Sequence, residues 1–154
     1  ALAEVVNLHD PALEFEAIHR VVFGVDPAHL LSELERTLGA VPGRGEGQSF
    51  TCLYQGNRRE LTVPHPQANL AVGTLQNFLD GYLSSFGGRV DYIHGAEAAE
   101  RLSEEPGCVG VLLPDMGKEE LFPTVILDGA LPRKTFSMGH AWDKRYYLEA
   151  RKIR

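Results

Sequence analysis

Cationic, hydroxyl and imidazole side chains are concentrated in one ten-residue stretch near the end of the chain. Residues 131–140 read Leu-Pro-Arg-Lys-Thr-Phe-Ser-Met-Gly-His. Guanidinium and ammonium groups beside hydroxyls bind phosphate or carboxylate, and a neighbouring imidazole can donate a proton. The alternative is a solvated turn that tucks Phe136 and Met138 into the core. The chemical interpretation assigns anion binding and a catalytic imidazole to Arg133, Lys134, Thr135, Ser137 and His140.

A second candidate is the His19-Arg20 pair, which directly precedes the apolar residues 21–23. An imidazole and a guanidinium at the end of a strand could both face a cleft, with His19 catalytic and Arg20 binding an anion. The alternative is structural: Arg20 pairs with Glu14 or Glu16 next to a hydrogen-bonded histidine.

Other common site motifs are absent from the sequence. The six histidines form no HxxxH pair, there is no CxxC, and we expect no preformed metal site. The glycine-rich stretch 42–47 fits neither GxGxxG nor GxxxxGK(S/T), so we interpret it as a connector rather than a phosphate loop. Cys52 and Cys108 each lie in an apolar run, which favours reduced, buried thiols, although a Cys/His pair assembled in space stays open.

Composition excludes several classes of function. The net charge of −6 argues against nonspecific nucleic-acid binding, and only residues 133–154 are locally basic. The chain has no run of 18 apolar residues, so we expect a cytoplasmic protein without a membrane partner. It starts with Ala, and the strand-like run 2–8 begins almost at once. We therefore expect residues 1–154 to be a single domain, a C-terminal fragment of a longer protein.

The candidate residues must be positioned by an α+β fold. Helical spacing and capping signals predict helices over 27–38 and 71–86, a short helix around 98–102, and a helix over 118–127 that Pro123 interrupts or restarts. Apolar runs predict strands at 2–8, 21–23, 49–55, 59–63, 89–94, 108–113 and 145–153, with a hairpin turn at Gly56-Asn57. We expect a single mixed β-sheet with packed helices, in which 108–113 is a central strand.

These segments resemble the C-terminal half of the bacterial and archaeal family called domain of unknown function 1015. The resemblance spans the chain and rests on residues 4–7, 13–20, 91–94, 131–140 and 144–149. It implies an N-terminal half, absent here, with an Asp-Gly-(His or Asn)-His motif similar to that of ParB-like nucleotide-using proteins, a group that includes free-serine kinases. It also implies that His19, Arg20 and Lys134 contribute to a cleft shared with that half.

The leading hypothesis is therefore an uncharacterised domain of a small-molecule enzyme that handles phosphate or a nucleotide. The chain would contribute anion-binding residues, without turnover in isolation, and its partners would be the N-terminal half and a phosphorylated small molecule. Whether the chain is itself an enzyme, and which cofactor it uses, stays open. The alternative is a non-catalytic regulatory or oligomerisation module, for which a homodimer is one form.

Overall fold

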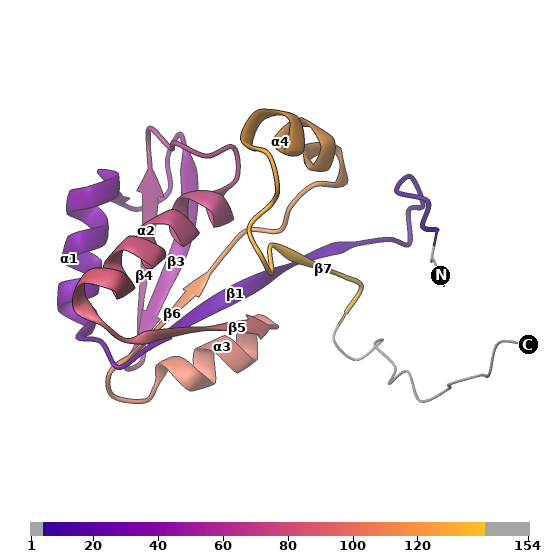
Figure 1. Cartoon of the computed structure of the whole chain (residues 1–154). Helices are drawn as coiled ribbons and strands as arrows, with labels where there is room; N and C mark the ends of the chain where they lie inside the picture. The colour runs from indigo at the N-terminus through magenta and orange to yellow at the C-terminus, as the bar shows by residue number, and fades with distance from the viewer. Residues whose placement is uncertain (1–4, 141–154) are drawn as a thin grey trace, which may run out of the picture.

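One antiparallel sheet forms the centre of the structure (Figure 1). In the computed structural model, which describes residues 5–140, the strands follow the order β2-β4-β3-β6-β1-β5, and β7 also pairs with β1. The strands are β1 (Phe15–Phe23), β2 (Val41–Pro42), β3 (Gln48–Tyr54), β4 (Asn57–Val63), β5 (Arg89–His94), β6 (Cys108–Leu112) and β7 (Phe136–Met138). The helices are α1 (Pro27–Leu38), α2 (Ala71–Phe86), α3 (Ala96–Ser103) and α4 (Leu121–Asp128), with a 3₁₀ turn, η1 (Lys118–Glu120), before α4.

The α+β class with one sheet and packed helices is confirmed, but the expectation of a mixed sheet is wrong. Every pair among the described strands is antiparallel. The unit β5-α3-β6 is a crossover between two strands that run in the same direction, an arrangement that often makes parallel neighbours. Here β1 lies between them and pairs with both, so the two parallel strands never touch.

Helices cover the sheet on both faces, as Figure 1 shows. Leu30, Leu34, Leu75 and Leu79 from α1 and α2 are fully buried in one cluster with residues of β3, β4 and β6. α3 packs on the opposite face over Gly110 of β6, where a Cβ atom would lie 3.2 Å from the Cβ of Ser103. The prediction of a central strand covered on both faces is therefore confirmed.

The start and end of α1 follow from capping chemistry. The Asp26 carboxylate accepts a hydrogen bond from the Ala28 N–H at 3.1 Å, and Pro27 occupies the first helical position. Gly39 ends the helix with φ of 63°, the left-handed conformation that glycine adopts without a steric penalty. The predicted bounds of α1 and α2 are confirmed.

Several strand predictions are wrong in detail. Residues 5–8 form no strand, and residues 1–4 lie outside the described part, as does the strand predicted over 145–153. β1 begins at Phe15 rather than at Val21. Its polar residues Glu16, His19 and Arg20, which interrupt the apolar pattern, are hydrogen-bonded to His94, to the Leu113 N–H and to backbone carbonyls. β7 was not predicted at all, and the hairpin turn lies at Gln55-Gly56, one residue earlier than expected.

The helix predicted over 118–127 begins as a 3₁₀ turn and becomes α-helical at Leu121. Pro123 is the third residue of α4, where its missing N–H costs nothing because first-turn amides have no partner within the helix. The predicted interruption is present, but the change from 3₁₀ to α-helix lies at Leu121, two residues before Pro123.

Candidate functional site

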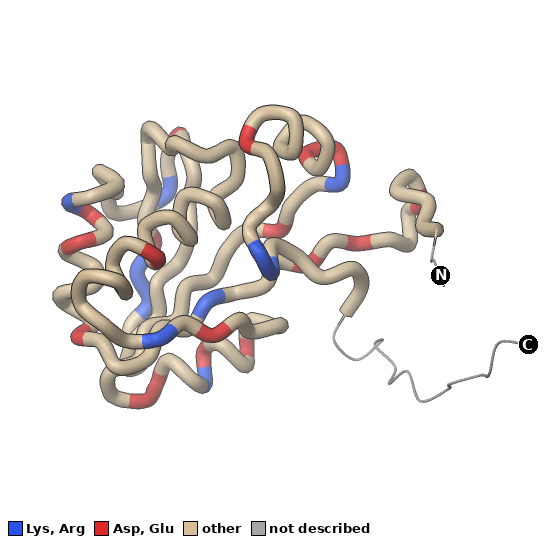
Figure 2. The backbone as a smooth tube through the Cα atoms, in the orientation of Figure 1, with Lys and Arg blue, Asp and Glu red and all other residues tan. Residues whose placement is uncertain are grey.

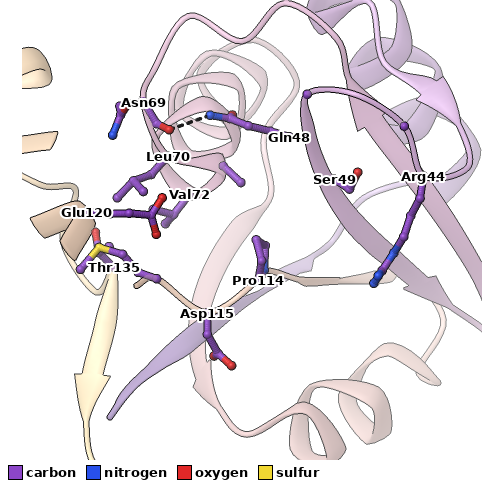
Figure 3. A pocket seen from close by; sticks show the side chains of 14 residues that line it. Arg44, Gln48, Ser49, Asn69, Leu70, Val72, Pro114, Asp115, Glu120 and Thr135 are labelled. Carbon is purple, nitrogen blue, oxygen red and sulfur yellow. Dashed lines mark hydrogen bonds between the residues drawn. The ribbon is translucent and has the colours of Figure 1, made fainter. Parts of the chain in front are cut away.

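A cleft of about 420 Å³ opens where β6 ends and α2 begins. Pro114 and Asp115 follow β6, Leu70 and Ala71 start α2, and the loop between β2 and β3 closes a third side. In Figure 3, Arg44 lies on one side of the cleft and Glu120 and Thr135 lie on the other. The lining consists of Arg44, Gly45, Gly47, Gln48, Ser49, Asn69, Leu70, Ala71, Val72, Pro114, Asp115, Met116, Glu120 and Thr135.

The glycine-rich loop 43–47 can line this cleft because it lies close against β4. Gly47 has φ of 119°, and a Cβ atom there would lie 2.2 Å from the carbonyl oxygen of Val63. The N–H of Gly43 donates to the carbonyl of Glu60 at 2.9 Å. Gly45, in contrast, has no heavy atom within 4 Å of an added Cβ. The loop is anchored at both ends, and its central residue faces open space.

Gln48 joins the loop to the start of α2. Its Nε2 donates to the carbonyls of Ala68 and Asn69 at 2.8 and 3.1 Å, and its Oε1 accepts from the Thr74 hydroxyl at 2.7 Å. Gln48 is half-buried, and an amide that uses donors and acceptor together fixes the orientation of the segments it connects. Gln48 therefore sets the position of the α2 start relative to β3.

The first turn of α2 has no side-chain cap. Its first backbone bonds run from the N–H groups of Gly73 and Thr74 to the carbonyl of Leu70. Ala71 and Val72, which precede them in the helix, line the cleft. Uncapped N–H groups and the helix dipole favour negative charge at this end of the cleft.

The charged side chains of the cleft have mixed sign. Arg44 pairs through Nε with Glu60 at 3.2 Å. Asp115 accepts the Ala17 N–H through Oδ1 at 2.7 Å, and Glu120 accepts the Gly117 N–H through Oε2 at 2.7 Å. Each of these groups keeps further donors or acceptor positions beyond the contact named. The cleft can thus present positive charge at the loop and carboxylates at the end of β6.

Arg20 is fully buried and acts as a clamp between β1 and the segment before β7. Its guanidinium donates to the carbonyl oxygens of Lys134 at 2.8 Å and Arg133 at 3.2 Å, and also to that of Ile18. A longer bond of 3.4 Å reaches Gln76 Oε1. Burial lowers the pKa of Arg20 to about 10, so the side chain remains charged at neutral pH. The structural alternative, pairing with Glu14 or Glu16, is not what the described contacts show.

The other residues of the predicted anion loop lie in different surroundings. Arg133 donates through Nε to the Tyr92 hydroxyl at 2.9 Å, and Lys134 has a left-handed φ of 56°. Thr135 is buried, donates to the carbonyl of Pro132 at 2.6 Å and lines the cleft. Ser137 is buried within β7 opposite Glu16.

The predicted catalytic imidazoles lie apart from the cleft lining. His19 Nδ1 accepts the Leu113 N–H at 3.2 Å, and burial lowers the pKa of His19, which favours the neutral ring. His140 contacts Glu16 through Nδ1 and Glu14 through Nε2. His94 also contacts Glu16. A neutral His19 with an occupied Nδ1 carries its proton on Nε2.

Of the residues proposed from sequence, Thr135 alone is among the residues that line the cleft. Arg20 and His140 both attach the β7 region to β1, and Phe136 stacks on Phe15 with ring centroids 4.1 Å apart. The alternative of a turn that tucks Phe136 and Met138 into the core is half correct, because Met138 is 49% exposed.

Sequence reasoning missed Arg44, Gln48, Asn69 and Asp115. The glycine-rich loop matches no phosphate-loop motif, so the sequence pattern predicts only a connector there. The position of the loop is the available signal. The loop ends just before β3, and the neighbouring strand β4 leads through a Pro-rich connection to α2, the longest predicted helix, whose start is uncapped.

The structure of residues 5–140 gives little support to a metal site or to a reactive thiol. No group of three or more His, Cys, Asp or Glu residues there could hold a metal ion. Both cysteines are free and buried, and burial raises the pKa of Cys52 to about 12, which makes its thiol a poor nucleophile. None of the helices that the structure describes is both long and apolar enough to cross a bilayer.

Charged positions of both signs are spread along the described backbone (Figure 2). Exposed pairs such as Arg36–Glu33 and Arg58–Glu100 account for some of the basic side chains. The tube shows no stretch in which Lys and Arg gather without Asp or Glu nearby. This part of the chain offers no broad basic face of the kind that tracks a phosphate backbone.

Comparisons with known proteins establish the fold alone. No family model matches the chain, and no curated protein matches it. A solved structure described as a conserved hypothetical protein from Pyrococcus furiosus is similar, with a TM-score of 0.63 and 15% sequence identity. The match covers 90% of this chain and 61% of that chain, so this chain spans less than two thirds of its length.

Proposed function

We propose that this chain is the C-terminal domain of a small-molecule enzyme and that its cleft binds the phosphate or carboxylate group of the substrate. The domain of unknown function 1015 is the family to which we assign it. The observation that carries the proposal is the cleft itself, where Arg44, the glycine-rich loop and the uncapped start of α2 meet.

The physical basis is the convergence of donors around one space. Backbone N–H groups at a helix start and a guanidinium form hydrogen bonds to anionic oxygens without ordering additional segments. The volume of about 420 Å³ is in the range of small-molecule sites. Asp115 and Glu120 on the far side favour a substrate that also carries hydroxyl or amino groups. Residues of a further N-terminal half would complete the catalytic machinery.

The roles of the residues proposed from sequence change accordingly. Thr135 stays a binding residue, because it lines the cleft, but its hydroxyl proton goes to the Pro132 carbonyl, so the hydroxyl would accept from a substrate hydroxyl or amino group rather than donate to the anion. Arg20 becomes a positioning residue, since its donors hold the carbonyls directly before Thr135. Arg133, Lys134 and Ser137, the other residues proposed for anion binding, lie outside the cleft lining. Lys134 stays a candidate for a cleft shared with the N-terminal half, and His19 and His140 are not assigned to proton transfer in the cleft.

Thermal-shift titration tests this proposal. Inorganic phosphate and adenosine monophosphate are titrated at constant ionic strength, with chloride as the reference salt. A ligand at ten times its Kd stabilises the folded state by about 1.4 kcal/mol, which raises Tm by about 3 to 6 °C. Arg44→Ala is expected to remove most of that rise.

Arg58→Ala is the matched control, because Arg58 also makes one exposed ion pair, with Glu100, at the same distance of 3.2 Å. It should leave the shift intact. Gly45→Phe is expected to block the cleft without disturbing the fold, since an added Cβ meets no atom within 4 Å. A ligand-induced shift that survives both Arg44→Ala and Gly45→Phe would refute the cleft as the site.

One observation favours a second function, that of an assembly module. α4 is reversed relative to an ordinary surface helix: polar Thr124 is 1% exposed, whereas apolar Ile126 and Leu127 are 81% and 70% exposed. Such a face is typical of an interface that another protein surface covers. The N-terminal half of the same protein and a second copy of this chain are the two partners that we consider.

A further inference from the structure

Four titratable side chains form a row that attaches the end of β7 to the start of β1. Glu16 accepts hydrogen bonds from His94 Nε2 on one oxygen and from His140 Nδ1 on the other. The row continues because His140 Nε2 lies 3.5 Å from Glu14 Oε2. None of these four residues lines the cleft.

The contacts of His140 fit one protonation state of its ring. A neutral imidazole carries a proton on one nitrogen, so it can donate to one carboxylate while its lone pair faces the other. An imidazolium donates from both nitrogens. His140 has a hydrogen bond to Glu16 at Nδ1 and an ion-pair contact with Glu14 at Nε2, and both contacts favour the imidazolium. His94 differs, since a single N–H to Glu16 suffices in its neutral form.

Apart from the hydrogen bonds of Arg20 to the carbonyls of residues 133 and 134, which precede β7, the attachment that this row supports is small. β7 pairs with β1 over three residues, Phe15 to Ala17. Beyond it, the Gly139 N–H donates to the Glu14 carbonyl at 3.0 Å, and Phe136 stacks on Phe15. A short pairing of this kind opens locally at low cost in free energy, so one ion pair changes its open fraction measurably.

We propose that the row is a pH-sensitive latch, in which the imidazolium of His140 bridges Glu14 and Glu16 and thereby holds β7 on β1. Loss of that proton leaves one carboxylate facing a lone pair and releases the end of β7. Because Thr135 directly precedes β7 and lines the cleft, opening of β7 alters that wall. The latch itself does not depend on what the cleft binds.

The charged groups around the row determine the pH range over which the latch is closed. His19, Arg20 and Asp115 lie near it, since Asp115, Arg20, His94 and Glu16 all act on the charge of His19. Burial of Glu16 raises its pKa, but the hydrogen bonds and charges of His94 and His140 lower that pKa further, and the net shift is downward. Glu16 therefore stays ionised as pH falls below 4.5, its ordinary value. Histidine side chains change charge between about pH 5 and 8. The latch is therefore expected to open as pH rises through this range.

Amide hydrogen exchange of the full chain tests the latch. The protection factor of the Gly139 amide, corrected for intrinsic exchange, is measured at pH 5.5 and pH 8.0 by NMR. We expect about tenfold greater protection at pH 5.5. Amides of the β3–β4 hairpin report global stability. The ratio of their protection factors at pH 5.5 and pH 8.0 should differ from the ratio for the Gly139 amide.

Glu14→Gln is the decisive variant. A Gln amide can donate to the Nε2 lone pair of neutral His140, so the latch should stay closed at both pH values and the tenfold ratio should fall below about twofold. His140→Gln should lower Gly139 protection at pH 5.5 to the wild-type value at pH 8.0. His29→Gln, which removes a histidine bonded to Tyr82 on α2, should keep the full ratio.

Three results would overturn the latch: equal Gly139 protection at both pH values in the wild-type chain, a tenfold ratio that persists in Glu14→Gln, or a ratio that His29→Gln abolishes. The last would assign the effect to global stability. Hairpin amides that keep their protection show that each variant folds.

Discussion

Arg20 shows how a residue proposed for ligand binding can serve the fold. It lies on β1 with no carboxylate among its hydrogen-bond partners in the described structure, and its donors go to the backbone of Ile18, Arg133 and Lys134. The guanidinium also lies 5.0 Å from the centre of the Tyr92 ring. The five N–H groups of a planar guanidinium fork reach carbonyls on different sides at once, whereas the three donors of an ammonium group all sit on a single nitrogen atom.

Replacement of Arg20 by Met should therefore be costly. The carbonyls of Arg133 and Lys134 would lose their donor, and a buried acceptor without a partner costs about 1–3 kcal/mol. We expect the free energy of unfolding, measured by urea titration, to fall by about 2–4 kcal/mol. Arg20→Lys should recover less than half of this loss. Arg58→Ala, at an exposed ion pair, should cost less than about 1 kcal/mol. A loss below 0.5 kcal/mol for Arg20→Met would contradict the clamp.

At the scale of the elements, the sequence predicts well where one physical signal dominates. α1 carries an Asp-Pro start and a Gly end, and α2 repeats its apolar residues at helical spacing, so both have the expected bounds. β7 carries no such signal. β7 and the two residues before Thr135 are held by Phe15, Arg20 and Glu16, which lie more than 100 positions away, and no local pattern encodes those contacts.

α4 illustrates a local pattern that is correct but incomplete. The sequence predicts a helix here, and the helix forms at one end of the molecule (Figure 1). Its apolar residues Ile126 and Leu127 are nevertheless exposed. The reversal arises because Asn69 holds its inner side: Nδ2 donates to the Thr124 hydroxyl and the backbone N–H to Asp128, both at 2.6 Å.

This orientation makes a prediction about Ile126. Ile126→Glu should leave the free energy of unfolding within about 0.5 kcal/mol of the wild type, since the side chain is already exposed. Binding of the dye ANS, measured by fluorescence, should fall by about half, because the apolar face is interrupted. Thr124→Val, on the buried side, should destabilise the chain by about 1 kcal/mol and leave dye binding unchanged.

Unchanged ANS fluorescence in Ile126→Glu would contradict the view of α4 as an exposed apolar face. Sedimentation velocity then separates the partners. Concentration-dependent dimers that Ile126→Glu abolishes would favour a second copy, whereas monomers at all concentrations would favour the N-terminal half.

At the scale of the whole molecule, the site was harder to predict than the fold. Sequence reasoning gathered Arg20, Lys134 and His140 into one site because they carry the chemistry. In the structure the Arg20 side chain, the Lys134 carbonyl and the His140 side chain attach the β7 region to β1. The cleft is instead lined by residues from five separate segments of the chain. Neither Gln48 nor Asp115 stands out in the sequence, since their roles depend on the α2 start and on Ala17, which are distant in the chain.

The central claim is that an anion binds at the start of α2. The most direct measurement is an NMR titration of the ¹⁵N-labelled chain with inorganic phosphate at constant ionic strength, following backbone amide shifts. We predict saturable changes at Gly45, Ala71 and Val72, and their loss in Arg44→Ala. Changes confined to Arg133 and Lys134, or no saturable change at any amide, would contradict the proposed site.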